Sequence, residues 1–380
     1  MRKSYLLTPG PTPIPESISA ILAQPIIHHR TPAFESIFQN VKQGLKVLFQ
    51  TQNEVLVLTT SGTGAMEAAL TNLFSRGQKV ITVNGGKFGE RWTHLAKAFA
   101  LNPIEITLPA GEALNPATLE AVTQTHPDAK GILFQASETS TGVVMPTREI
   151  CKIAAKAGMI SVCDAITACG VFDLPMDEWQ IDVLMTGSQK ALMLPPGLAM
   201  IALSDRAWRL QTQSDLPKFY FDLGKERKGQ AKNQTPWTPA ISLIQGLQES
   251  LRLIQEEGLP SLFKRHDLLA RATRNAIHAL GLELLAKTAP SNAVTAVKVP
   301  HSIPEGKRIP QLMRDKHGVT IAGGQDELEG KIFRLSHFGY CGRFDVMTGI
   351  AALELVLHEL GHPFTLGAGV SAVLRTYAEG

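Results

Sequence analysis

The chain has 380 residues and a formal net charge of +3 at pH 7, with 44% hydrophobic and 19% charged residues. This composition is ordinary for a globular enzyme with a large core, and the small charge gives no reason to expect a nucleic-acid or membrane partner. The length exceeds what one core usually supports, so two domains are expected. No apolar run reaches the roughly 20 residues of a membrane span. The N-terminus also lacks a signal-peptide core, so a cytoplasmic protein is predicted.

The N-terminal segment, residues 1–17, is rich in proline and cannot form a helix. Its apolar residues, Tyr5, Leu6, Leu7 and Ile14, favour an extended arm that lies on another surface over a loose tail.

Apolar runs typical of buried strands alternate with stretches of helical periodicity over the first 203 residues. The predicted strands are Val55–Leu58, Val80–Val83, Ile104–Leu108, Gly131–Gln135, Met159–Cys163, Ile181–Met185 and Leu198–Leu203. The predicted helices are Phe34–Phe49, Met66–Phe74, Glu90–Leu101, Pro116–Gln124 and Thr147–Ala157. This alternation indicates an α/β domain with a mostly parallel sheet covered by helices. Ligands of such sheets gather at the carboxyl ends of the strands.

The pattern changes in the C-terminal part. Residues 211–240 are polar and end in Thr235-Pro-Trp-Thr-Pro239, which predicts one long functional loop. Further helices are predicted at Ile241–Glu256, Leu262–Leu280, Asp345–Leu360 and Val370–Ala378, and further strands at Val294–Val299 and Ile332–Ser336. We therefore expect an arm over residues 1–17, a large domain over 18–257 and a smaller α/β domain over 258–380.

A glycine-rich loop, residues 59–65, joins the strand Val55–Leu58 to the helix that follows it. Bare amides, the positive helix end and the hydroxyls of Ser61 and Thr63 suit an anion such as a phosphate. A plain helix cap would explain the two hydroxyls equally well. The loop matches neither a Walker loop nor the dinucleotide-binding motif.

Lys190 lies in the stretch Met185–Gly197, an apolar, Gly/Pro-bounded loop between two predicted strands. Desolvation there would lower the pKa of its amine, as a Schiff-base nucleophile requires; a solvated loop lysine is the alternative. With the anion loop, an aromatic ring after a strand (Phe88) and an acid after a strand (Asp164), Lys190 meets the needs of pyridoxal phosphate. These needs are a phosphate cradle, a flat apolar face, a carboxylate at the ring nitrogen and an amine at the aldehyde.

The chain resembles class V aminotransferases of the alanine–glyoxylate and serine–pyruvate group, which are fold-type-I pyridoxal phosphate enzymes. The resemblance covers nearly the whole chain. It rests on Pro9-Gly-Pro11, Ser61-Gly-Thr-Gly-Ala-Met-Glu67, Glu138-Thr-Ser-Thr-Gly142, Asp164, Gly187-Ser-Gln-Lys190 and Arg334. It implies a large domain with a mostly parallel seven-stranded sheet, a smaller C-terminal α/β domain and a homodimer with shared active sites.

The resemblance also implies roles for single residues. Lys190 would form the Schiff base, Asp164 would pair with the ring nitrogen, and Arg334 would bind the substrate carboxylate, near Gly10. The other implied cofactor contacts are Ser61, Gly62, Thr63, Phe88, Ile166, Gln189, and one or both of Thr139 and Ser140. Thr238, with help from Thr235, would reach the phosphate from the neighbouring subunit, which would explain the long loop.

The implied reaction is transfer of an amino group from alanine or serine to a 2-oxo acid, with glyoxylate as the acceptor and glycine as the product. Phosphoserine is an alternative donor, because His28-His-Arg30 resembles a loop that phosphoserine aminotransferases use, although members of the glyoxylate group carry a similar stretch. Aspartate is another, because the class also contains archaeal aspartate aminotransferases.

A subunit of a redox complex is a third alternative, since some relatives have been labelled soluble hydrogenase subunits. The four cysteines oppose it, because Cys151, Cys163, Cys169 and Cys341 form no C-x-x-C pair and redox metals require clustered thiolates. We therefore expect buried thiols and no metal site. Cys341 follows Arg334, whereas the loop cysteine of desulfurases precedes the matching arginine, so a structural role is predicted for it.

Overall fold

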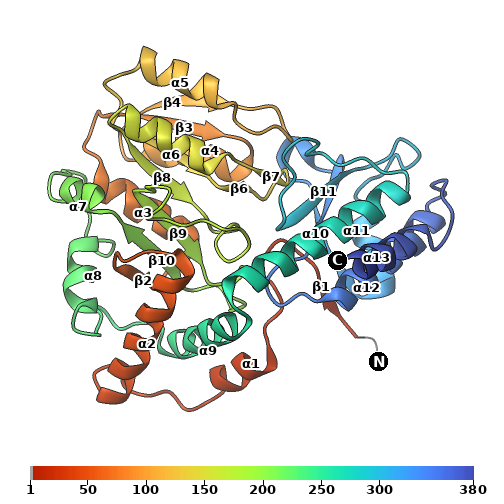
Figure 1. Cartoon of the computed structure of the whole chain (residues 1–380), viewed down its shortest axis with the longest axis horizontal. Coiled ribbons are helices and arrows are strands. Elements are labelled where there is room, and N and C mark those ends of the chain that lie inside the picture. Colours follow the sequence, from red (N-terminus) through yellow and green to blue (C-terminus); the bar gives the residue numbers. More distant parts are fainter. Residues whose placement is uncertain (1–2) are drawn as a thin grey trace.

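The computed structural model describes residues 3–380, so Met1 and Arg2 of the predicted arm lie outside the described residues. Figure 1 shows a large sheet between two layers of helices and, beside it, a smaller sheet with helices of its own. We call these two parts the large body and the small body. No helix within residues 3–380 has the length and apolarity needed to cross a membrane.

The large body contains a seven-stranded sheet with the strand order β2-β10-β9-β8-β5-β3-β4. Its strands are β2 (Val55–Leu58), β3 (Lys79–Asn84), β4 (Asn102–Thr107), β5 (Gly131–Gln135), β8 (Ile160–Asp164), β9 (Val183–Gly187) and β10 (Ala199–Leu203). Strand β10 runs antiparallel to both of its neighbours, and the other pairs are parallel. The predicted mostly parallel, seven-stranded sheet is confirmed.

Alternate residues of each strand face opposite helical layers. In β2, Val55 and Val57 share a core with α2 (Pro32–Phe49), α5 (Pro116–Thr125), α6 (Thr147–Lys156) and α9 (Ile241–Glu257). Leu56 and Leu58 pack instead with α3 (Gly62–Leu73), α4 (Lys87–Ala98) and α7 (Asp205–Gln211). Because both faces are buried, the inner strands are largely apolar runs in the sequence, whereas the edge strand β4 has exposed polar residues.

The small body is built on an antiparallel sheet with the order β11-β14-β13. Its strands are β11 (Val294–Lys298), β13 (Ala322–Gly323) and β14 (Ile332–Ser336), and its helices are α10 (Leu259–Ala279), α11 (Arg308–His317), α12 (Arg343–Glu359) and α13 (Ala368–Glu379). These helices share one core with the sheet. Gly258, with a φ of 76°, separates α9 from α10. We propose the boundary between domains 18–257 and 258–380 at this glycine.

The N-terminal segment connects the two bodies. Strand β1 (Tyr5–Leu6) pairs in parallel with β12 (Val319–Thr320), and Leu7 is buried in the core of the small body. The chain then runs to the large body, where the Thr12 hydroxyl donates to the Lys190 carbonyl at 2.9 Å. Helix α1 (Glu16–Leu22) follows.

The prediction of one long loop over residues 211–240 is wrong, because the chain forms helix α8 (Leu223–Gln230) there. The Asp222 carboxylate caps this helix by accepting from the amides of Gly224 and Lys225, at 3.0 and 3.1 Å. On its inner face, the Gln230 side chain bonds the backbone N–H and C=O of Val57 on the edge strand β2, at 2.9 and 2.8 Å. Two of the three buried residues of α8, Glu226 and Gln230, are polar, so hydrophobic periodicity does not reveal the helix.

Candidate active site

The predicted site residues of the large body follow the carboxyl ends of its parallel strands. Ser61, Gly62 and Thr63 follow β2, Phe88 follows β3, Thr139 and Ser140 follow β5, Asp164 ends β8, and Gln189 and Lys190 follow β9. Parallel strands present these ends at one edge of the sheet, which is where such folds bind ligands.

Lys190 is a buried lysine with an exposed fraction of 8%. Its amine donates a hydrogen bond to the Pro9 carbonyl of the N-terminal segment. Burial lowers the pKa of Lys190 to about 8, although the Asp164 carboxylate raises it; the charges of Arg334 and Arg91 lower it further. At pH 7 about a tenth of these amines are therefore neutral. Lys190 is not a solvated loop lysine.

Asp164 is buried, and its Oδ1 accepts a hydrogen bond from the Ile166 amide at 2.8 Å. Burial raises the pKa of Asp164 to about 6, against the lowering effect of the Ile166 amide. Within residues 3–380, no cation lies within ion-pair distance of this carboxylate. A protonated ring nitrogen would supply the missing positive charge.

The hydroxyls of the glycine-rich loop differ in what they bond. Ser61 is the N-cap residue of α3, but its side chain makes no capping hydrogen bond, so a plain helix cap does not account for it. Thr63 Oγ1 accepts from Arg91 Nη1 at 2.9 Å, which brings a guanidinium to the amino end of α3. A Cβ at Gly62 would collide with the Ile166 side chain. The loop thus combines free amides, hydroxyls and positive charge, as an anion site requires.

Thr139 and Ser140 differ in what their hydroxyls can still do. The Ser140 hydroxyl donates to the Glu138 carboxylate, and its oxygen accepts from the Lys87 amide at 3.0 Å. The Thr139 hydroxyl pairs with that of Thr167 at 2.6 Å, where either can be the donor. Ser140 has therefore committed its only proton, whereas Thr139 can still turn a proton toward a ligand.

Arg334 lies on the central strand of the small sheet and is buried. Its Nε donates to the Gly323 carbonyl at 2.9 Å and its Nη1 donates to the Thr139 carbonyl at 3.0 Å. Burial lowers the pKa of Arg334, while the Glu138 carboxylate raises it. In the described part of the chain no side-chain carboxylate forms an ion pair with Arg334, and Nη2 makes no hydrogen bond. This geometry leaves one edge of the guanidinium for a carboxylate.

Gly10 brings the N-terminal segment against the lysine. Its φ of 107° favours glycine, and a Cβ at this position would lie 2.6 Å from Lys190 Nζ. A residue with a side chain would therefore displace the lysine.

Three predicted cofactor residues, Gln189, Thr235 and Thr238, make no hydrogen bond to Lys190, Asp164 or the glycine-rich loop among the described residues. Gln189 Oε1 is buried and has no hydrogen-bond partner within residues 3–380. The Thr235 hydroxyl donates to the Trp237 carbonyl in its own loop, and Thr238 is exposed.

Arg91 is a site residue that the sequence patterns do not reveal. Its guanidinium bonds Thr63, lies 5.1 Å from the centroid of the Phe88 ring and acts electrostatically on Asp164 and Lys190. The only signal in the sequence is its place one turn into the helix that follows β3. Periodicity gives no direction for such a side chain.

These residues fit pyridoxal phosphate. Among residues 3–380, the glycine-rich loop offers the Ser61 hydroxyl, which caps nothing, and the buried Gln189 oxygen after β9 has no hydrogen-bond partner. The Asp164 carboxylate suits a cationic ring nitrogen, and the Lys190 amine suits an aldehyde. Together with the doubly covered sheet, they define a pyridoxal phosphate-dependent transferase of fold type I. The family model described as "Aminotransferase class-V" matches residues 5–334, and the chain belongs to this family of pyridoxal phosphate-dependent transaminases.

Similar proteins cover the whole chain. "Soluble hydrogenase, small subunit" of a Synechococcus strain is 44% identical, with 98% of each chain covered. "L-aspartate--glyoxylate aminotransferase" of Paracoccus denitrificans is 34% identical, over 98% of this chain and 96% of that protein. Among solved structures, the ureidoglycine-glyoxylate aminotransferase of Bacillus subtilis has a TM-score of 0.93 at 26% identity, with 100% of this chain and 99% of that chain covered.

Proposed function

We propose that this aminotransferase carries pyridoxal phosphate on Lys190 and moves an amino group from alanine or serine to glyoxylate, which gives glycine. The observation that carries the proposal is the buried pair of Lys190 and Asp164, to which the small body adds Arg334 with one free guanidinium edge. Names of two of the similar proteins contain glyoxylate, which supports the acceptor.

Each of these side chains has a task in the proposed reaction. When bound, the cofactor accepts the electron pair left on the substrate Cα. Arg334 binds the α-carboxylate and thereby orients Cα. The neutral Lys190 amine takes the Cα proton and later returns a proton, for which a pKa of about 8 is well suited. Asp164 would keep a proton on the ring nitrogen, and Thr139 would offer its hydroxyl to the ring oxygen.

We propose a small, uncharged donor side chain because an acidic one would need a second cation besides Arg334. Arg91 is bonded to Thr63, and the Lys87 amine is paired with Glu90 and Asp326. Among residues 3–380 Arg91 has no ion pair, but it lies at the glycine-rich loop, where the proposed phosphate would use its charge. Neither of these two cations is then left for a donor with an acidic side chain.

Aspartate is the second candidate donor, because the Paracoccus protein is named for it. Arg30, whose side chain bonds Gln234 at 3.0 Å in the loop that carries Thr235 and Thr238, would then supply the second cation. A phosphoserine donor would also need Arg30, as the cation for its phosphate. The hydrogenase name of the Synechococcus protein keeps a redox-complex subunit as a further candidate, and metal analysis of the purified chain tests it.

We also propose a homodimer in which Thr238, assisted by Thr235, completes the phosphate site of the neighbouring subunit. Phe219 and Tyr220 are 71% and 43% exposed and form an aromatic cluster with Trp237. The Tyr220 hydroxyl bonds the Thr59 carbonyl, so this cluster lies beside the glycine-rich loop. An exposed aromatic cluster of this kind is typical of an interface. The cytoplasmic location stays a prediction.

The test is an amino-donor screen on the purified enzyme loaded with pyridoxal phosphate. Alanine, serine, aspartate and phosphoserine are each mixed with it, and the change in cofactor absorbance is followed in a single turnover with glyoxylate or pyruvate as the acceptor. Borohydride reduction followed by peptide mass spectrometry must place the cofactor on Lys190. A cofactor attached to another lysine, or no response to any of the donors, would refute the proposal.

A further inference from the structure

We propose that Glu138 is a positioning residue that holds Phe88 and Ser140 in the places from which they frame the cofactor ring. This inference rests on the proposed function, because it assumes that the ring lies against Phe88. Nothing in the reaction itself uses Glu138, yet its carboxylate is completely buried at the edge of the site.

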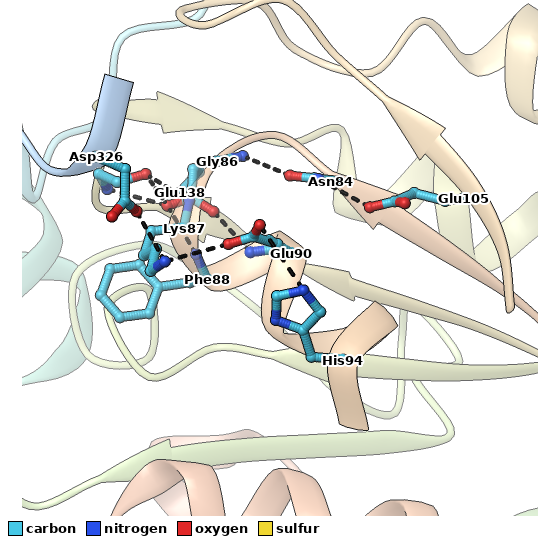
Figure 2. A network of polar contacts seen from close by, with 11 residues as sticks. Asn84, Gly86, Lys87, Phe88, Glu90, His94, Glu105, Glu138 and Asp326 are labelled. Atoms are coloured by element: carbon cyan, nitrogen blue, oxygen red, sulfur yellow. Dashed lines mark hydrogen bonds and ion pairs between the residues drawn. The ribbon is translucent and has the colours of Figure 1, made fainter. Parts of the chain in front are cut away.

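Glu138 belongs to the short strand β6 (Ser137–Glu138) and supplies the missing cap of helix α4. The N-cap residue of α4 is Gly86, which has no side chain to offer. The Glu138 carboxylate accepts instead from the amide of Gly89 at 2.9 Å and from that of Phe88 at 3.4 Å. Figure 2 shows Glu138 beside Phe88 at the start of α4. A Cβ on Gly86 would lie 2.9 Å from the carboxylate carbon, so the glycine permits this approach. A carboxylate at a helix amino end is stabilising.

Ser140 extends the same arrangement. Its amide donates to Glu138 at 3.0 Å and its hydroxyl donates to the same oxygen, while the Ser140 oxygen accepts from the Lys87 amide at 3.0 Å. One carboxylate thus fixes the first turn of α4, which carries Phe88, and the segment that carries Thr139 and Ser140. Burial raises the pKa of Glu138, whereas the hydrogen bonds from Ser140, Gly89 and Phe88 lower it and so favour the ionised carboxylate. Hydrogen bonds to an ionised group are stronger than neutral ones.

The opposite side of this turn is held more weakly. The Lys87 amine pairs with Asp326 at 2.7 Å, in the short helix η1 (Asp326–Leu328) of the small body, as Figure 2 shows. The two side chains are 38% and 61% exposed, and ion pairs in water contribute little. The position of Phe88 therefore depends on the buried carboxylate and not on this ion pair.

The experiment compares Glu138→Gln with Glu354→Gln in enzyme loaded with pyridoxal phosphate. Glu354 is a matched control, because it is also a buried glutamate whose carboxylate accepts from amides at a helix amino end. These amides belong to Gly367, just before α13, and to Val370, in its first turn. Two properties are measured: the dissociation constant of the cofactor, and the circular dichroism of the cofactor band per bound cofactor. The second reports how the ring is held and does not depend on turnover.

We expect Glu138→Gln to raise the cofactor dissociation constant by at least about tenfold, as the loss of hydrogen bonds to a buried charge implies, and to reduce the dichroism. Glu354→Gln should leave both values at those of the wild type. If Glu138→Gln does not fold, Glu138→Asp keeps the charge, but its shorter side chain cannot reach both α4 and Ser140, and it should also reduce the dichroism. Wild-type values for the folded Glu138 variants would overturn the inference. A wild type that binds no cofactor would instead refute the proposed function.

Discussion

At the scale of single residues, the buried charges of Asp164 and Lys190 destabilise the cofactor-free protein. Burial raises the pKa of Asp164 to about 6 and lowers that of Lys190 to about 8. Both shifts show that the charged forms are poorly solvated, so the two groups do not compensate each other as a structural ion pair would. Such paired shifts are typical of functional sites.

Asp164→Asn is therefore expected to stabilise the cofactor-free protein by about 3 kcal/mol at pH 8. The native pKa of about 6 exceeds the ordinary value of 3.8. The native state thus binds more protons between these values, and the stability of the wild type falls as the pH rises through this window. The gain should shrink to about half at pH 5.

Urea denaturation at pH 5 and pH 8 measures this difference. Asp182→Asn is the control, because the buried Asp182 carboxylate accepts from the Ser161 amide and the Ser204 hydroxyl, at 3.1 and 2.8 Å. This variant should lose stability at both pH values. An Asp164→Asn protein that is also less stable at both would contradict the account.

Arg334→Lys should lower kcat/KM for the amino donor by about 100-fold or more, because a buried carboxylate loses its bidentate partner. The cofactor band should not change, since the hydrogen bonds of the Arg334 side chain within residues 3–380 go to the backbone carbonyls of Gly323 and Thr139 and not to a side chain assigned to the cofactor. Arg274→Lys is the control in the same body; it alters a partly buried guanidinium that bonds Ser291 and Asn292. A kcat/KM that Arg334→Lys leaves unaltered would show that the carboxylate binds elsewhere.

At the scale of elements, the sequence predicts best those strands that are buried on both faces of the sheet. Most strands of the large sheet were found because they are apolar runs, and their ends move by only one or two residues; the edge strand β4 is half polar and was found from Ile104 and Ile106. The helices α1, α7, α8 and α11 have no predicted counterpart. The first three have only seven or eight residues, and α11 buries only Ile309 and Met313. In the site, motif resemblance names Lys190, Asp164 and Arg334. It gives no role to Arg91 or Glu138, whose contacts arise between segments far apart in the chain.

Gln230 of helix α8 is expected to stabilise the edge strand β2. Gln230→Ala should lower the free energy of unfolding by about 2–4 kcal/mol, because it leaves the N–H and C=O of Val57 buried and unpaired. Gln213→Ala, at an exposed glutamine, should stay within about 0.5 kcal/mol of the wild type. Both values come from urea denaturation, and the cofactor band should be the same in both variants. An equal effect of the two changes would mean that α8 does not support the edge strand.

At the scale of the whole molecule, the site is assembled from parts that do not form one local unit. Lys190 comes from the large body, Arg334 from the small body and Gly10 from the segment that joins them. The Pro9 carbonyl and Thr12 connect that segment to Lys190 on both sides of Gly10. A substrate held by Arg334 therefore contacts both bodies, and their relative position contributes to the alignment of Cα with the lysine.

The proposed dimer adds a fourth part and can be tested by mixing two inactive proteins. Lys190→Ala lacks the amine, and Thr238→Glu places a carboxylate where the neighbouring phosphate would bind. In a mixed dimer, the chain with an intact Lys190 meets an intact Thr238 from its partner, so one site is complete. After dissociation and random reassociation, about a quarter of the wild-type activity should return, whereas each variant alone stays inactive. Thr212→Glu, at an exposed threonine, should be active by itself. Mixed dimers that form, as checked by mass, and yet stay inactive would show that Thr238 does not act across the interface.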